Sequence, residues 1–228
     1  TGLPQRLSPK ELDGSPRPAW DLVPLDEYWR HYPFFGVDRG RAMQVLGTRG
    51  CPYHCSFCSS PQMWTTRYVV REPEDVVDEI AEYVEGFGVE NINFVDLTAA
   101  TNRRWTIGFC DAMERRGLDV QWQLPVGTRI EAIDREVLQR LWDTGCKNIT
   151  FAPESGSQRM LDVMNKRVKL SRIEQSIRES YEIGLRTTVN VMIGHPAERW
   201  PDLWKSAKLL ARSAWIGCDD TAVMMFCP

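Results

Sequence analysis

The sequence is short of the features that mark membrane, secreted and nucleic-acid-binding proteins. None of its apolar runs approaches the roughly 18 residues that a membrane-spanning helix needs. Its first residues lack the charged-then-apolar opening of a signal peptide. Basic residues are not in excess, because 28 Lys and Arg face 31 Asp and Glu and the net charge is −3. These absences argue against a membrane span and against electrostatically driven binding to nucleic acid.

The cysteine content argues against a disulfide framework. The 228 residues contain seven cysteines, an odd number, and three of them, Cys51, Cys55 and Cys58, lie within eight positions. Disulfide-stabilised domains are usually smaller and richer in cysteine. Thiols clustered in an acidic chain of ordinary size indicate a metal or cluster site in a reducing compartment. We therefore expect a cytoplasmic protein.

The first 40 residues differ in composition from the rest of the sequence. Six of the 14 prolines lie there, and proline at that density blocks helices and sheet ladders. We expect an extended linker that lies on a neighbouring surface and is anchored by its aromatic residues: Trp20, Tyr28, Trp29, Phe34 and Phe35. A disordered tail is the alternative. Because the sequence begins without methionine, we also expect residues 1–40 to connect a preceding domain to a core at 41–228 that is truncated at its carboxyl end.

Beyond residue 40, short apolar runs alternate with helical patterns. Pro73 opens the first helical segment, Asp134 caps the third, Ser171 and Glu174 form a capping box for the fourth, and Pro201 opens the fifth. Six runs are typical of strands: 42–46, 91–95, 120–126, 148–152, 187–193 and 221–226. This alternation predicts an α/β fold of parallel βα units, as an open sheet or as a complete or partial barrel. In each case functional residues gather at the C-terminal edge of the strands.

The three clustered cysteines directly follow the first predicted strand and therefore lie at that edge. Thiolates on so compact a loop can converge on one [4Fe–4S] cube, which ordinarily takes four cysteines. The next cysteine, Cys110, comes 52 positions after Cys58 in a predicted helix, so one iron would lack a local protein ligand and could bind an exchangeable group. Three other readings remain open: a zinc site of three cysteines and His54, a redox pair of Cys55 and Cys58, or chance clustering of buried thiols.

The spacing Cys-x-x-x-Cys-x-x-Cys, with Phe57 before the last cysteine, resembles the radical S-adenosylmethionine superfamily. The resemblance covers residues 42–228. It implies that Cys51, Cys55 and Cys58 hold a [4Fe–4S] cluster whose fourth iron binds the methionyl amine and carboxylate of S-adenosylmethionine, with Phe57 in the cofactor site. It further implies reductive cleavage of the cofactor to a 5′-deoxyadenosyl radical. Six strands favour the partial (β/α)6 barrel of this superfamily over the full barrel.

Later segments are similar to other parts of that family and imply more cofactor-binding residues. Asp96 ends the second predicted strand, where the family contacts the methionyl amine, although the usual Gly-Gly-Glu is absent. Glu154 and Ser155 begin a Glu-Ser-Gly-Ser segment of the kind that contacts the cofactor, and Gly194 lies in a fifth-strand pattern whose backbone runs near the adenine. Arg129, after the third predicted strand, has a planar guanidinium that can bind a carboxylate of cofactor or substrate. Each also has a structural alternative, as a loop cap, a helix N-cap, a turn glycine or a surface ion pair.

The cysteine motif, the Glu-Ser-Gly-Ser segment and the proline-rich lead-in together look like the cobalamin-dependent branch of the superfamily. That branch includes C-methyltransferases and anaerobic magnesium-protoporphyrin ester cyclases, in which a cobalamin-binding domain precedes the barrel. The resemblance implies methylation or oxidative rearrangement of an unactivated carbon in a small-molecule substrate, with a flavodoxin or ferredoxin as reductant and without nucleic acid. The alternatives are a methylthiotransferase and a non-catalytic iron–sulfur electron carrier.

Overall fold

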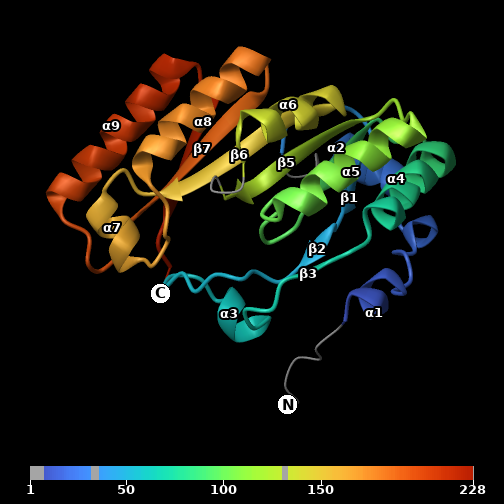
Figure 1. Cartoon of the computed structure of the whole chain (residues 1–228), viewed down its shortest axis with the longest axis horizontal. Helices are drawn as coiled ribbons and strands as arrows, with labels where there is room; N and C mark the ends of the chain where they lie inside the picture. The colour runs from blue at the N-terminus through green and yellow to red at the C-terminus, as the bar shows by residue number, and fades with distance from the viewer. Residues whose placement is uncertain (1–7, 32–35, 130–132, 228) are drawn as a thin grey trace.

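The framework of the protein is a six-stranded sheet in which each neighbouring pair of strands is parallel (Figure 1). The computed structural model describes residues 8–31, 36–129 and 133–227. The strands lie in the order β1 (Ala42–Val45), β4 (Asn91–Phe94), β5 (Gln121–Thr128), β6 (Cys146–Glu154), β7 (Arg186–Ile193) and β8 (Asp220–Met225). In the described chain β1 and β8 form opposite edges, so the sheet is open. The predicted α/β fold with six strands is confirmed, and the open sheet is that of a partial barrel.

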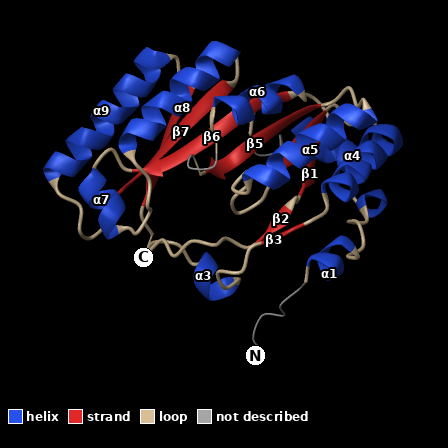
Figure 2. Ribbon diagram, in the orientation of Figure 1, coloured by secondary structure: helices blue, strands red, loops and turns tan. Residues whose placement is uncertain are grey.

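A layer of helices covers one side of this sheet (Figure 2). It consists of α4 (Pro73–Phe87), α5 (Arg103–Arg116), α6 (Arg135–Asp143), α8 (Leu170–Ile183) and α9 (Trp200–Ile216), whereas the short α7 (Gln158–Val163) lies beyond the C-terminal end of β6 (Figure 1). Asp134 caps α6 as predicted, because its carboxylate accepts a hydrogen bond from the backbone N–H three positions on. The capping box predicted at Ser171 and Glu174 is wrong. Leu170 packs against the core, so the N-cap position falls on Lys169, two residues before Ser171, and Ser171 lies inside the first turn of α8.

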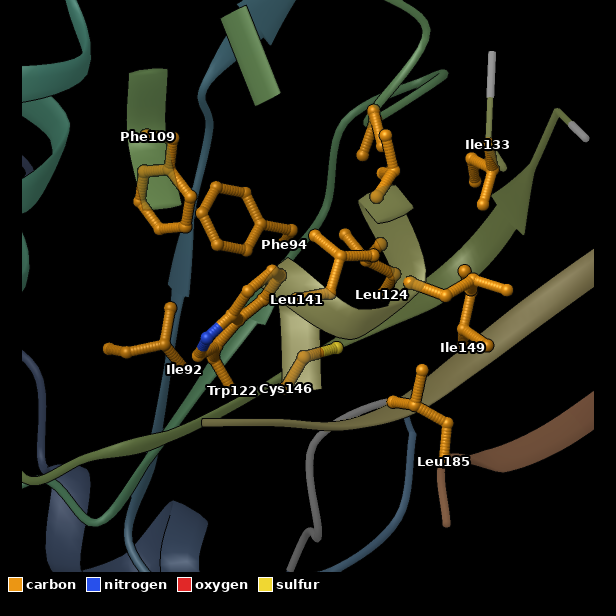
Figure 3. Close-up of a cluster of buried hydrophobic side chains, with 14 of the residues drawn as sticks. Ile92, Phe94, Phe109, Trp122, Leu124, Ile133, Leu141, Cys146, Ile149 and Leu185 are labelled. Carbon is orange, nitrogen blue, oxygen red and sulfur yellow. The ribbon is translucent and has the colours of Figure 1, made fainter. Parts of the chain in front are cut away.

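The main hydrophobic core lies between the sheet and the helices (Figure 3). Three rings from different elements meet edge to face in it: Phe94 of β4, Phe109 of α5 and Trp122 of β5, with centroids 5.2–5.4 Å apart. Burial of each such side chain contributes roughly 1.5–3 kcal/mol. Trp122 also satisfies its indole N–H, which donates to the backbone oxygen of Thr144 at 2.8 Å. This packing fixes the strands whose C-terminal ends carry the site.

The proline-rich lead-in contains short helices, so the expected extended conformation is wrong. Its described part forms α1 (Pro9–Asp13), the 3-10 helix η1 (Trp20–Leu22) and α2 (Leu25–His31). Proline is tolerated in the first turn of a helix, where its missing N–H has no partner to lose, and Pro9 occupies that place. Ser8 and Glu11 complete a capping box there. Proline density therefore limited the length of these helices without preventing them.

Two of the five aromatic residues that we expected to anchor the lead-in, Trp20 and Trp29, do contact the core. Trp20 packs edge to face on a ring of α4 at 6.3 Å, and the indole N–H of Trp29 donates to the β1 backbone at 2.8 Å. Tyr28 is 44% exposed. Phe34 and Phe35 lie outside the described residues. The connection of this segment to a preceding domain stays a prediction.

A two-stranded hairpin that the sequence did not predict carries the clustered cysteines. It pairs β2 (Thr48–Arg49) antiparallel with β3 (Val69–Val70), and α3 (Ser60–Met63) lies between them in the chain. Figure 1 shows this part of the chain on the side of the sheet opposite to the helical layer. Separately, no helix among the residues that the structure describes is long and apolar enough to cross a membrane.

Candidate functional site

The cysteine loop, residues 50–59, runs from the end of β2 to the start of α3. Gly50 opens it with a φ of +88°, and a Cβ at this position would lie 2.0 Å from the backbone oxygen of Arg67, so a side chain does not fit. Inside the loop, the backbone N–H of Cys58 donates to the oxygen of Cys55 at 3.2 Å. The loop therefore has a defined backbone course before any group binds to it.

All three cysteines of the loop line one cavity of about 350 Å³ at the C-terminal ends of the strands. The other lining residues come from the loop itself, the strand ends and the α7–α8 connection: Phe57, Leu97, Thr98, Gly127, Arg129, Ala152, Glu154, Lys166, Asn190, Met192, Met224 and Met225. The structure thus brings predicted residues Phe57, Arg129 and Glu154 together with the cysteines. Among the described residues that line this cavity, the predicted Asp96, Ser155 and Gly194 do not appear.

The surroundings of the cysteine loop act on the Cys51 thiol. Burial raises the pKa of Cys51, and the neighbouring Cys55 and Cys58 raise it further, whereas a backbone hydrogen bond at Tyr53 and the charge of Arg129 lower it. The Nη1 atom of Arg129 lies 3.6 Å from the sulfur of Cys55, within hydrogen-bond range for sulfur. Because metal ligation requires thiolates, the cation favours the form of cysteine that binds iron.

Arg129 is held between the cysteine loop and the α7–α8 connection. It follows β5 directly and is only 5% exposed, so it does not lie on the surface. Its guanidinium stacks over Tyr53 at 3.5 Å from the ring centroid, and its Nη2 donates to the backbone oxygen of Lys166. These contacts fix the position of the positive charge beside the thiols.

Glu154 forms a nearly buried ion pair in the cavity with Lys166, a residue that the sequence reasoning missed. Its Oε1 lies 2.7 Å from the Lys166 ammonium, and the two side chains are 14% and 8% exposed. The ammonium also lies 5.6 Å from the ring centroid of Phe57. Glu154 has a φ of +71°, a conformation that residues other than glycine rarely adopt and that is enriched at functional sites. Lys166 lies in an irregular connection with no periodic pattern, so no sequence signal distinguished it.

Ser155 and Gly194 follow residues that line the cavity closely in sequence, but their own hydrogen bonds are made outside the cavity lining. Ser155 is fully buried, its hydroxyl accepts from the N–H of Ser157 at 3.1 Å, and it lies 3.2 Å from the hydroxyl of Ser206 on α9. Gly194 is exposed with a φ of +89°, and its N–H donates to Glu198 at 2.7 Å. Ser155 therefore joins the end of β6 to α9, and Gly194 shapes the turn after β7. Cofactor binding by either residue stays a prediction.

Asp96 is fully buried beneath the hairpin rather than facing the cavity. Its carboxylate accepts hydrogen bonds from the backbone N–H of Gly47, at 3.2 Å, and from the hydroxyl of Thr48. Burial raises its pKa to about 6, because the hydrogen bonds only partly offset the loss of hydration. The side chain thus fixes the start of the segment that leads into the cysteine loop. Contact between Asp96 and a cofactor stays a prediction.

The donor set of the cavity fits an iron–sulfur cube. Within the described ranges no three His, Cys, Asp or Glu side chains converge closely enough to hold a single metal ion. A cube binds each thiolate through a different iron, so its ligands are spread more widely than those of one ion. Cys51, Cys55 and Cys58 line one cavity, and no fourth cysteine is among the described residues that line it. Three irons of a cube would therefore have thiolate ligands, and one would be left for a non-protein ligand.

One protein family and several curated proteins are similar to this chain in sequence. The Radical SAM superfamily matches residues 45–210. An uncharacterized methyltransferase of Pyrococcus horikoshii is 28% identical over 195 residues, which is 86% of this chain and 40% of the relative. An anaerobic magnesium-protoporphyrin IX monomethyl ester cyclase of Cereibacter sphaeroides is 31% identical over 179 residues, which is 78% of this chain and 28% of the relative. The chain therefore spans less than half of the length of either relative.

Solved structures share the fold. The radical S-adenosylmethionine methyltransferase TsrM from Kitasatospora setae superimposes with a TM-score of 0.75 at 20% identity, over 96% of this chain and 39% of that one. The cobalamin-dependent S-adenosylmethionine radical enzyme OxsB superimposes with a TM-score of 0.64 at 16% identity, over 73% of this chain and 26% of that one. At these identities the likeness concerns the arrangement of helices and strands.

Proposed function

We infer what this chain does from one premise: it belongs to the radical SAM superfamily. We propose that Cys51, Cys55 and Cys58 hold a [4Fe–4S] cluster and that the adjoining cavity binds S-adenosylmethionine. When bound, the two groups supply a one-electron reductive cleavage of the cofactor to methionine and a 5′-deoxyadenosyl radical. The observation that carries this proposal is the cavity in which the three thiols meet the charged Arg129, Glu154 and Lys166.

The chain's own residues would bind and orient the cofactor. The carboxylate of Glu154 can accept hydrogen bonds from ribose hydroxyls or from an ammonium group, and its ion pair with Lys166 holds that carboxylate in place. Arg129 supplies positive charge beside the thiolates. The side chains of Leu97, Met192, Met224 and Met225 give part of the cavity an apolar lining, against which uncharged parts of the cofactor can pack.

The reaction class we propose is methylation or oxidative rearrangement of an unactivated carbon in a small molecule. Support comes from the names of the two curated relatives, one a methyltransferase and the other a cyclase. We place the protein in the cobalamin-dependent branch, with cobalamin bound outside these 228 residues, and residues 1–40 leading from that domain into the core. A cytoplasmic flavodoxin or ferredoxin would supply the electron, and no nucleic acid would take part.

Product analysis after anaerobic reconstitution tests this function. The protein is loaded with iron and sulfide, reduced with dithionite and incubated with S-adenosylmethionine, and 5′-deoxyadenosine and methionine are quantified. We expect about four irons per chain and reductant-dependent release of both products. A variant with Cys51, Cys55 and Cys58 all changed to Ala is the control. A cluster that takes up and returns electrons without cleaving S-adenosylmethionine would identify an electron carrier and overturn the proposal.

A further inference from the structure

The connection between α7 and α8 reaches the cysteine loop from a distant part of the chain. The backbone N–H of Ser56 donates to the oxygen of Met164 at 2.9 Å, and the hydroxyl of Ser56 donates to the oxygen of Val163 at 3.4 Å. The side-chain amide of Asn165 donates to the oxygen of His54 at 2.8 Å, across 111 positions of sequence. Residues 163–167, which we call the supporting segment, therefore hold the middle of the cysteine loop.

The supporting segment also contacts the opposite wall of the cavity, through Lys166. The ammonium of Lys166 lies 2.7 Å from Glu154 at the end of β6. The backbone oxygen of Lys166 accepts a hydrogen bond from Arg129 at the end of β5. A single short segment thus joins the cysteine loop to the ends of two strands.

The backbone of the supporting segment is unusual and well anchored. Asn165 and Arg167 have φ values of +51° and +56°, and asparagine is among the few residues that tolerate this left-handed region. The N–H of Lys166 donates to the oxygen of Leu161 at 2.9 Å. Met164 is fully buried in a small apolar cluster against which Phe57 of the cysteine loop packs. Such a conformation persists only where surrounding contacts determine it.

We propose that the supporting segment positions the cluster and the cofactor site relative to each other. Asn165 holds the cysteine loop in the conformation that receives the cluster, and Lys166 holds the Glu154 carboxylate toward the cofactor. The inference rests on the proposed function and adds two residues to it. Asn165 acts through the carbonyl of His54 and is a positioning residue, because it touches neither the thiols nor the cavity in the described structure.

The test distinguishes the effect of losing the hydrogen bond between Asn165 and His54 from the effect of changing the backbone conformation of the supporting segment. Asn165→Asp keeps the size of the side chain and its tolerance for positive φ but removes the donor to His54. Asn165→Gly keeps the backbone conformation and removes the side chain. The matched control is Gln158→Ala, because Gln158 donates to the oxygen of Val168 at 3.1 Å in the same connection but does not contact the cysteine loop. Thermal melting of each variant verifies that it is folded.

Two readouts apply, one of which needs no cluster. The first is the rate at which a chelator removes iron from reconstituted protein, and the second is the rate at which iodoacetamide alkylates the loop thiols of iron-free protein. We expect both rates to rise at least fivefold in Asn165→Asp and Asn165→Gly and to stay within twofold of the parent in Gln158→Ala. Rates for Asn165→Asp within twofold of the parent overturn the role of Asn165. Should Asn165→Asp fail to fold, Asn165→Gly decides by the same threshold.

The Lys166 half of the proposal has its own test. Lys166→Met, in cluster-loaded protein, should weaken S-adenosylmethionine binding at least fivefold by calorimetry while the iron content is retained. An unchanged dissociation constant overturns this half. If the parent protein itself takes up no cluster, the proposed function fails, and the alkylation rates still decide whether Asn165 holds the cysteine loop.

Discussion

The ammonium of Lys166 lies 2.7 Å from a carboxylate oxygen of Glu154 inside the cavity that the three clustered cysteines line. Both side chains are largely withdrawn from water, so each charge depends on the other for stabilisation. Glu154 is the last residue of β6 and Lys166 lies in the irregular connection between α7 and α8. The pair therefore reflects the demands of the site more than those of the fold.

Removing either charge of this pair should destabilise the protein, because the remaining charge would be left without its partner in a mostly buried position. We expect Glu154→Gln and Lys166→Met each to lower the free energy of unfolding by roughly 1–3 kcal/mol. The double variant should recover part of that loss. Urea unfolding of the four proteins gives the coupling energy, and additive effects of the two changes would contradict a direct interaction.

Glu154→Gln should also weaken binding of S-adenosylmethionine while the cluster is retained. A neutral amide accepts hydrogen bonds less strongly than a carboxylate, so we expect an affinity loss of about tenfold, equivalent to about 1.4 kcal/mol. Glutamine avoids the extra strain of a shorter side chain at a position of positive φ. Calorimetry on cluster-loaded protein measures the change. Glu174→Gln is the control, because Glu174 pairs with Arg212 on the helical surface at 3.2 Å, and equal affinities of both variants would remove Glu154 from the site.

Single cysteine replacements should divide into two groups. Cys51→Ala, Cys55→Ala and Cys58→Ala each remove a thiol that lines the cavity, so each should lose most of its iron and its visible absorbance after reconstitution. Cys110 and Cys146 are fully buried in the main core, where Figure 3 shows Cys146 among apolar side chains. Their replacement should lower stability but leave about four irons bound. Full iron content in all three loop variants would refute the ligand assignment.

The parts of the fold that depend on local pattern could be predicted from the sequence. Apolar runs separated by amphipathic segments predicted the six strands and their parallel direction, and three closely spaced cysteines indicated the cluster loop. The short helices of the lead-in could not be predicted in the same way, because a high density of proline argues against regular structure and no apolar periodicity marks where a helix begins. Pro9 stands at the start of a helix, where proline is compatible with helical geometry.

Residues whose role depends on tertiary contacts could not be assigned in the same way. Lys166 and Asn165 lie in an irregular connection, and only the folded chain brings them to Glu154 and His54. Asp96 was correctly placed at a strand end, but strand position alone could not reveal that its carboxylate turns toward Thr48 instead of the cavity. Sequence patterns thus located the edge at which the site forms, whereas side-chain direction required the structure.

The lead-in should depend on Arg17 for its attachment to α4. This side chain is 27% exposed, and it lies 2.7 Å from Asp75 and 3.3 Å from Glu79. We expect Arg17→Ala to lower the free energy of unfolding by about 1 kcal/mol and to speed proteolysis within residues 8–31. Arg30→Ala is the matched control, because Arg30 is 60% exposed and pairs with Glu27 within its own helix. Equal proteolysis of the two variants would argue against an anchoring role for Arg17.

Asp96 should make the protein less stable as the pH rises from about 4 to about 6. Burial raises its pKa to about 6 from an ordinary value of 3.8. A carboxyl group whose pKa is higher in the folded than in the unfolded state binds its proton more tightly in the folded state, so its contribution to stability is fully present below about pH 4 and is lost as the pH rises through about 6. The size of the shift corresponds to about 3 kcal/mol in total.

Asp96→Asn provides the comparison, because asparagine does not titrate and retains an acceptor for the hydroxyl of Thr48. The other carboxyl groups are common to both proteins, so their titration largely cancels when the two free energies of unfolding are subtracted at each pH. We expect the stability of the parent relative to Asp96→Asn to fall between about pH 4 and pH 6 and to level off above about pH 7. Urea unfolding at pH 4, 5, 6 and 7 (chosen to bracket the pKa of about 6) measures this difference. A difference that stays constant over the range would show that Asp96 ionises in the folded protein as readily as in water, and one that grows in favour of the parent as the pH rises would show that it ionises more readily; either result contradicts the raised pKa.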